Sequence, residues 1–223
     1  MSDRQRRGAE RLNRDRLIEA AVELIDADGV DKLTVRRVAA SVDVTPMALY
    51  WHFTNKEELL DGVGDALADR LDLSSIEQDS AWDDRLSKLL HTLIEALAEH
   101  PRAAEITMRR LLYTDAGKRL AELWMTMLRN AGLSDADAFL VGRYALRTAV
   151  AVASEPVFTG ADVAPARASR LQHEFDEQIA GSGSEFPALR DIREDMRTAS
   201  DSRRYREVAV RLLVNGVRHF LSR

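Results

Sequence analysis

Apolar residues recur every three or four positions along most of the chain, which is the spacing of one helical face. The first such run extends from Leu17 to Ile25 and stops before Gly29, a residue type that commonly ends helices. Later runs of the same period cover residues 33–39, 46–53, 56–71, 82–99, 101–108, 116–131, 134–155 and 205–221. The pattern therefore predicts an all-α protein.

The two shortest runs, at residues 33–39 and 46–53, predict two helices joined by a tight turn at Asp43. Thr34 and Thr45 stand where an N-cap is needed, and Pro46 falls at the first helical position, where its missing N–H costs nothing. A second helix of about two turns is too short to stand alone, so it must be anchored by packing. The side chains that we expect it to bury are Leu49, Trp51 and Phe53.

A pair of this kind is typical of a helix-turn-helix, in which the second helix enters the major groove of DNA and the first crosses the phosphate backbone. Arg36 suits a guanine edge, while Met47 and Ala48 suit thymine methyl groups. The residues expected to contact DNA are Thr34, Arg36, Arg37, Thr45, Pro46, Met47, Ala48, Tyr50, His52 and Lys56. Periodicity alone allows a plain helical hairpin equally well.

The run LTVRRVAASVDVTPMALYWHFTNKEELLD, residues 33–61, resembles the DNA-binding head of TetR-family transcriptional regulators. Its LYWHF and NK…LLD segments are especially similar to the tetracycline repressors, and the preceding LNRDRLIEAAVELIDADGVDKLT matches the first helix of the family. The close resemblance covers about residues 13–62. Beyond it, the similarity to the tetracycline-repressor type of regulatory domain rests on helix order, on Glu99-His100-Pro101, on Phe186-Pro187-Ala188-Leu189 and on the terminal apolar helix.

The resemblance implies a three-helix DNA-binding head at residues 13–60, preceded by a flexible basic arm at 1–12, and a larger helical body at 61–223 for ligand binding and dimerisation. It also implies a ligand-responsive repressor that binds a palindromic operator in double-stranded DNA as a homodimer and is released by a small, largely apolar effector. The alternative is a helical protein-interaction module without specific DNA binding. Tetracycline itself is not implied, because Leu71-Asp72 replaces the histidine expected late in the linker helix.

Composition and motifs argue against several other classes of protein. With 45% hydrophobic residues in 223, the chain can bury a sizeable core, and the absence of cysteine removes disulfides and thiolate chemistry. No signal peptide or uninterrupted apolar stretch of membrane-spanning length stands out, so we expect a cytoplasmic protein without membrane contact. No Gly-rich phosphate loop or Gly-x-Ser-x-Gly motif is present, so we expect neither an enzyme nor a cofactor.

Charge is uneven along the chain, whose net value is -5. Residues 1–16 carry six arginines against Asp3, Glu10 and Asp15, a local balance of +3. Such an arm either reaches a DNA groove or remains a solvated tail that adds salt-sensitive affinity. A metal site at His91, Glu95 and Glu99 fits helical spacing, but a solvated helix face explains these residues better, so no metal is expected.

The helix at 134–155 carries a stripe of small residues that would let another helix approach closely: Ala138, Gly142, Ala145 and Ala149. The resemblance implies a four-helix dimer bundle formed by this helix and the last one, whose contributing residues would be Val208, Leu212, Asn215, Gly216 and His219. The alternative is that both helices pack within one chain. Gly62 and Gly64, inside the helix at 56–71, indicate either a bend or another backbone packed closely against them.

An effector pocket is expected from apolar residues with a few polar anchors. The candidates are Met108, Leu112, Trp124, Met125, Leu128, Phe139, Arg143, Tyr144, Arg147 and Phe158. The alternative, which an apolar side chain in a helical protein favours, is that most of these residues are ordinary core.

Overall fold

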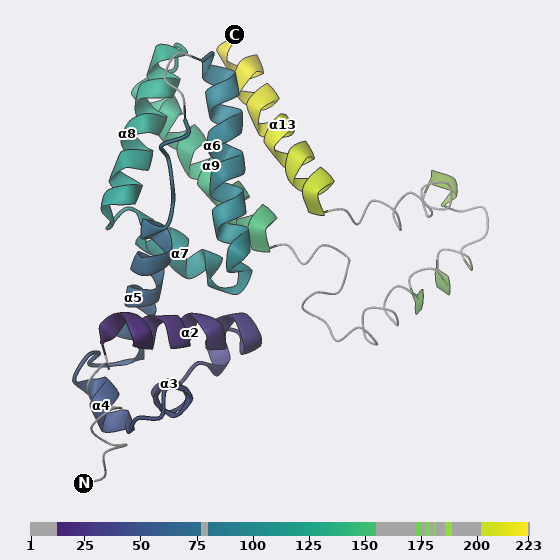
Figure 1. The fold of residues 1–223 in the computed structure, drawn as a ribbon. Helices are drawn as coiled ribbons and strands as arrows, with labels where there is room; N and C mark the ends of the chain where they lie inside the picture. Colours follow the sequence, from purple (N-terminus) through teal and green to yellow (C-terminus); the bar gives the residue numbers. More distant parts are fainter. Residues whose placement is uncertain are drawn as a thin grey trace.

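The computed structural model describes residues 13–76, 80–154 and 202–222, together with positions 173, 174, 177, 178, 181 and 186–188. Every regular element in these ranges is a helix, which confirms the all-α prediction, and Figure 1 shows a small head below a larger helical bundle. The elements are α2 (Arg14–Asp28), η1 (Val30–Lys32), α3 (Val35–Ser41), α4 (Pro46–Tyr50), α5 (Lys56–Asp69), α6 (Trp82–Glu99), η2 (Pro101–Ala103), α7 (Ala104–Leu111), α8 (Asp115–Asn130), α9 (Asp135–Ser154) and α13 (Ser202–Leu221).

The helices of the head begin where the capping residues predict. The side-chain oxygens of Thr34, Thr45 and Asn55 each accept a hydrogen bond from the amide three residues later, at 3.2, 3.3 and 2.8 Å. Pro46 occupies the first position of α4, and Asp43 adopts a left-handed φ of 57° in the turn before it. Local sequence signals therefore account for the helix-turn-helix.

The head closes around its own apolar core, which joins α2, α3, α4 and α5. Leu49 and Phe53 anchor the short α4 and the turn after it, at 0% and 1% exposure. The prediction that Trp51 is buried beside them is wrong, because Trp51 is 86% exposed. Trp51 directly follows α4, and its ring lies on the solvent side of the turn.

Helix α5 belongs to both parts of the molecule. Its buried apolar side chains from Leu59 to Leu67 pack into the head core, whereas Ala68 near its end and Leu71 just after it belong to the body core. The body in turn contributes Ala103 and Ile106 to the head core. The boundary expected at residue 60 thus falls inside a continuous helix, and the two cores share their border along α5 and α7.

Both glycines of α5 are sites of close packing, which favours the close-contact interpretation over the bend. A Cβ built on Gly62 would lie 3.2 Å from the Phe53 ring and 3.3 Å from Ile18. A Cβ on Gly64 would lie 2.9 Å from the Ile106 carbonyl oxygen and 2.6 Å from Cγ of Arg110. Gly64 therefore lets the backbones of α5 and α7 approach each other, and Gly62 makes room for side chains of the head.

We predict that Gly64→Ala lowers the thermal midpoint by a few degrees. Overpacking costs about 1–3 kcal/mol, which exceeds the gain of about 1 kcal/mol in helix propensity. Gly62→Ala should have a smaller effect, because its added methyl meets only side-chain atoms, which can shift. Thermal unfolding of both variants and the parent checks this order; a Gly64→Ala variant more stable than the parent would contradict the close contact.

Candidate functional site

The outer face of α4 presents large side chains to solvent. Met47 is 69% exposed, Tyr50 is 49% exposed and Trp51 directly after the helix is 86% exposed, whereas Leu49 is fully buried. These three exposed large side chains, two on α4 and one just after it, have no role in the core of this chain. Such a face is suited to base edges, thymine methyl groups and the sugar-phosphate backbone.

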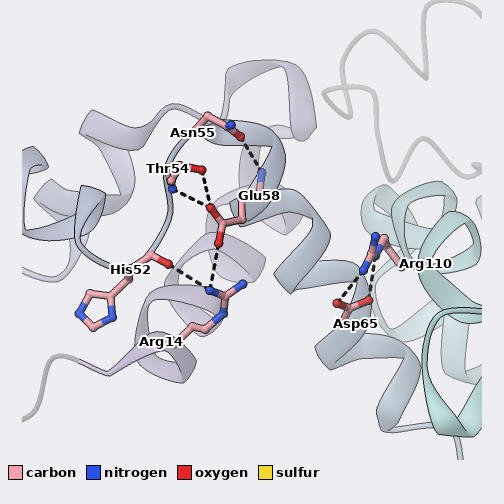
Figure 2. Close-up of polar contacts among 7 residues, drawn as sticks. All are labelled: Arg14, His52, Thr54, Asn55, Glu58, Asp65 and Arg110. Carbon is pink, nitrogen blue, oxygen red and sulfur yellow. Dashed lines mark hydrogen bonds and ion pairs between the residues drawn. The ribbon is translucent and has the colours of Figure 1, made fainter.

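Helix α4 is held in place by a polar network at the start of α5, shown in Figure 2. Glu58 accepts hydrogen bonds from the Thr54 hydroxyl (2.6 Å) and the Thr54 amide (2.8 Å), and it pairs with Arg14 of α2 at 3.3 Å. The same Arg14 donates to the carbonyl oxygen of His52 (3.0 Å), and its guanidinium carbon lies 4.3 Å from the centre of the Phe53 ring. The Thr54 hydrogen bonds, helped by Arg14, hold the pKa of Glu58 below its ordinary value.

The two adjacent arginines of α3 have different surroundings. Arg36 is exposed and makes no hydrogen bond or ion pair with any residue that the structure describes. Arg37 pairs with Asp28 and donates to the carbonyl oxygen of Lys32 at 3.0 Å, and its hydrogen bond lowers the pKa of Asp28. Arg37 thus ties α3 to the end of α2, and its predicted contact with DNA stays a prediction.

The other predicted DNA contacts lie around α4. Thr34, Thr45 and Pro46 are exposed and Ala48 is half-buried. The half-buried His52 points its ring away from Arg14 in Figure 2. Lys56 is half-buried as well, because its amine donates to the carbonyl oxygen of Val30 at 3.1 Å. Trp51 is the exposed side chain that the sequence analysis missed, since an aromatic residue between two anchoring positions resembles core.

The body contains a small cavity between α5, α6 and α7. Its volume is about 20 Å³, room for about one water molecule, whereas sites for drug-sized ligands measure about 300–1,000 Å³. Its lining residues are Leu67, Ala68, Leu71, Leu93, Ala96, Leu97, His100, Thr107, Met108 and Leu111. A drug-sized ligand would fit between these helices only if they moved apart.

The predicted pocket residues do not come together around this cavity. Of that set, only Met108 lines it; Leu112, Phe139 and Tyr144 are instead 58%, 57% and 68% exposed. The remaining members are the buried Trp124 and Leu128, the half-buried Met125, and the exposed Arg143 and Arg147. Phe158 lies outside the described residues. The pocket prediction therefore stays a prediction; half of the residues that line this cavity are leucines, whose pattern is that of ordinary core.

His100, which lines the cavity, also makes polar contacts with the head. Its Nδ1 lies 2.7 Å from a carboxylate oxygen of Asp26 in α2, and its Nε2 lies 3.4 Å from a guanidinium nitrogen of Arg70. Beside it, Arg102 donates to the carbonyl oxygens of Asp26 (2.9 Å) and Ala27 (2.6 Å), which end α2. The wall of the cavity is thereby bonded directly to the head.

The small-residue stripe of α9 faces the interior of its own chain. Ala138, Ala145 and Ala149 are each 0% exposed, and a Cβ on Gly142 would lie 2.7 Å from the indole nitrogen of Trp124. That nitrogen donates to the Ala138 carbonyl oxygen at 3.3 Å. The prediction that these four residues contact a second copy is therefore wrong, since helices of the same chain already bury them.

The solvent-facing sides of α9 and α13 carry the large apolar residues instead. On α9 they are Phe139, Leu140 and Tyr144, at 57–68% exposure. On α13, Leu212 is 68% exposed and Phe220 is 52% exposed. Of the predicted interface residues on α13, Val208 is half-buried and Leu212, Asn215, Gly216 and His219 are exposed. Large exposed apolar side chains on two helices that pack together are typical of a protein-protein contact.

Within the described ranges, no three His, Asp or Glu side chains are grouped so as to hold a metal ion. None of the helices seen there has the length and apolar character needed to cross a membrane.

Comparison with known proteins is consistent across both parts of the chain. Residues 17–63 match the model of bacterial regulatory proteins of the tetR family, and residues 76–221 match the tetracyclin repressor-like C-terminal domain. An HTH-type transcriptional regulator of Saccharopolyspora erythraea is 29% identical over 188 residues, which cover 84% of this chain and 77% of the relative.

Solved structures agree in fold. The crystal structure of BioQ with its double-stranded DNA operator is 29% identical, with a TM-score of 0.56 over 78% of this chain and 98% of that one. ActR of Streptomyces coelicolor in complex with actinorhodin has a TM-score of 0.71 over 96% of this chain and 100% of that one, at 23% identity, a likeness of fold alone. Because the two family models together span the head and the body, this chain belongs to the TetR family of DNA-binding transcriptional regulators, with a tetracycline-repressor-type C-terminal domain.

Proposed function

We propose that the chain is a repressor that binds a palindromic operator as a homodimer and releases it when a small, largely apolar effector enters the body. Residues 13–60 read DNA, residues 61–223 bind the effector and form the dimer, and the arm at 1–12 adds salt-dependent contacts. The observation that carries the proposal is the exposed face of α4, with Met47, Tyr50 and Trp51 outward on a helix anchored by Leu49 and Phe53. BioQ, a structural relative, was solved with its operator DNA.

The first experiment is selection of bound sequences from fragments of the source genome, followed by titration of the selected DNA at several salt concentrations. A repressor of this kind should select a palindrome and lose affinity as salt rises. Failure to bind any fragment specifically would favour the alternative, a helical interaction module without DNA contact.

The adjacent arginines of α3 provide a matched test of DNA reading. Arg36→Ala should cost about 1–3 kcal/mol of binding at one base pair and leave thermal stability unchanged, because Arg36 has no partner among the described residues. Arg37→Ala should instead lower thermal stability, because it removes the pair with Asp28. Titration against single-base operator variants, with melting curves, measures both; an equal loss on every sequence for Arg36→Ala would rule out base reading.

The exposed face of α9 and α13 is the proposed dimer contact. Leu212→Arg should leave the single chain folded, since Leu212 is 68% exposed, and should split the dimer, since an unpaired charge buried there costs about 3–5 kcal/mol. Leu112→Arg is the matched control, because Leu112 is a leucine of 58% exposure that follows α7, outside α9 and α13. Light scattering should show monomers for the first variant and dimers for the second; dimers in both would remove α13 from the interface.

The effector site is the cavity between α5, α6 and α7 in an expanded form. Apart from His100 and Thr107 its lining is apolar, and the Thr107 hydroxyl already donates to the Ala103 carbonyl oxygen at 3.0 Å. The site thus favours an apolar molecule with few polar groups. A screen of such compounds should find ones that release the selected DNA and raise the melting temperature of the free protein.

A further inference from the structure

The orientation of the recognition helix follows that of α5. The ring of Phe53, just after α4, packs on Gly62, and Thr54 bonds to Glu58 through both its amide and its hydroxyl. Helix α4 is thereby fixed to the first two turns of α5. Whatever sets the angle between α5 and the body also sets where the reading face of α4 points.

The side chain of Arg110, in α7 of the body, binds α5 where the two helices are closest. The stem of Arg110 covers Gly64, where an added Cβ would lie 2.6 Å from its Cγ. Its guanidinium forks onto Asp65, with Nε to Oδ1 at 2.8 Å and Nη2 to Oδ2 at 3.0 Å, as Figure 2 shows. It also lies 3.3 Å from Asp61 and stacks over the Tyr113 ring, 4.6 Å from its centre. The Arg110 side chain is only 22% exposed, so this pair is better shielded from solvent than a typical surface pair.

A small rotation of α5 at the Arg110 contact produces a large displacement of the DNA-binding face. Eight residues separate Gly64 from the start of α5, a length of about 12 Å along the helix. A rotation of about 10° at Gly64 therefore moves that end by about 2 Å, and opposite rotations in two heads change their separation by about 4 Å. One base pair advances the DNA by about 3.4 Å. Small changes at the Arg110 contact are thus comparable to one step along the operator.

We propose that Arg110 is a positioning residue that sets the half-site spacing accepted by the dimer. By holding Asp65 and Asp61 across the close contact at Gly64, it keeps both heads at one angle to the body, so that the two recognition helices meet half-sites at a single separation. This inference rests on the proposed function, since it needs a dimer that binds a palindrome. Arg110 would then contribute to operator specificity from a position in the body, without touching any base.

The test uses the full-length parent, Arg110→Met and a series of operators whose half-sites are moved apart or together by one or two base pairs. Each base pair also rotates one half-site by roughly 35° about the DNA axis. The parent should lose roughly tenfold or more in affinity for each step from its best spacing. Arg110→Met keeps the apolar stem and removes the fork, so its discrimination between neighbouring spacings should fall to less than about threefold.

Arg109→Met is the matched control, because it removes the same charge from the adjacent, exposed position of α7, which pairs with no described residue. It should keep the parent profile, and Arg110→Lys, which keeps the charge without the fork, should fall between. If Arg110→Met melts below the assay temperature, Asp65→Asn, which keeps the size of its side chain, takes its place. An unchanged spacing profile in the folded variant overturns the inference, even if affinity falls, whereas absence of palindrome binding by the parent overturns the proposed function instead.

Discussion

The close approach of α5 and α7 at Gly64 is the contact on which the arrangement of the molecule depends. Helix α5 is continuous through both cores, and α7 crosses beneath the body bundle to lie along it. Because Gly64 has no side chain, the Ile106 carbonyl and the Arg110 stem come within reach of the α5 backbone. The head is consequently not an independent domain on a flexible linker. Its angle to the body is set by packing and by ion pairs together.

Local rules predict most of the fold from the sequence. Thr34, Thr45 and Asn55 cap their helices, and the expected helix at residues 82–99 is the observed α6. These features depend on neighbours a few residues apart, which a sequence displays directly. The position of α4 was predictable for the same reason. A helix of five residues has only a few positions that can be buried and only a few that can contact a partner.

The faces of α9 could not be assigned in the same way. This helix is apolar on two sides, with small residues at Ala138 and Ala149 and large ones at Phe139 and Tyr144, and periodicity does not say which side its own chain covers. The indole of Trp124 decides it, since a ring packed against Gly142 needs the small side. A cavity among core leucines is equally invisible in sequence, as Leu93 and Leu97 would be apolar with or without an effector.

The sharing of the head core with Ala103 and Ile106 has a consequence for how such regulators diversify. A DNA-binding head cut at residue 60 would leave behind Val63 and Leu67 of α5 and the two body residues that complete its interior. A head moved from this chain to the body of another regulator would therefore need residues there that fill the places of Ala103 and Ile106. The surface of η2 and α7 has to change together with the head, so substitutions on the two sides of this border are expected to be correlated through evolution.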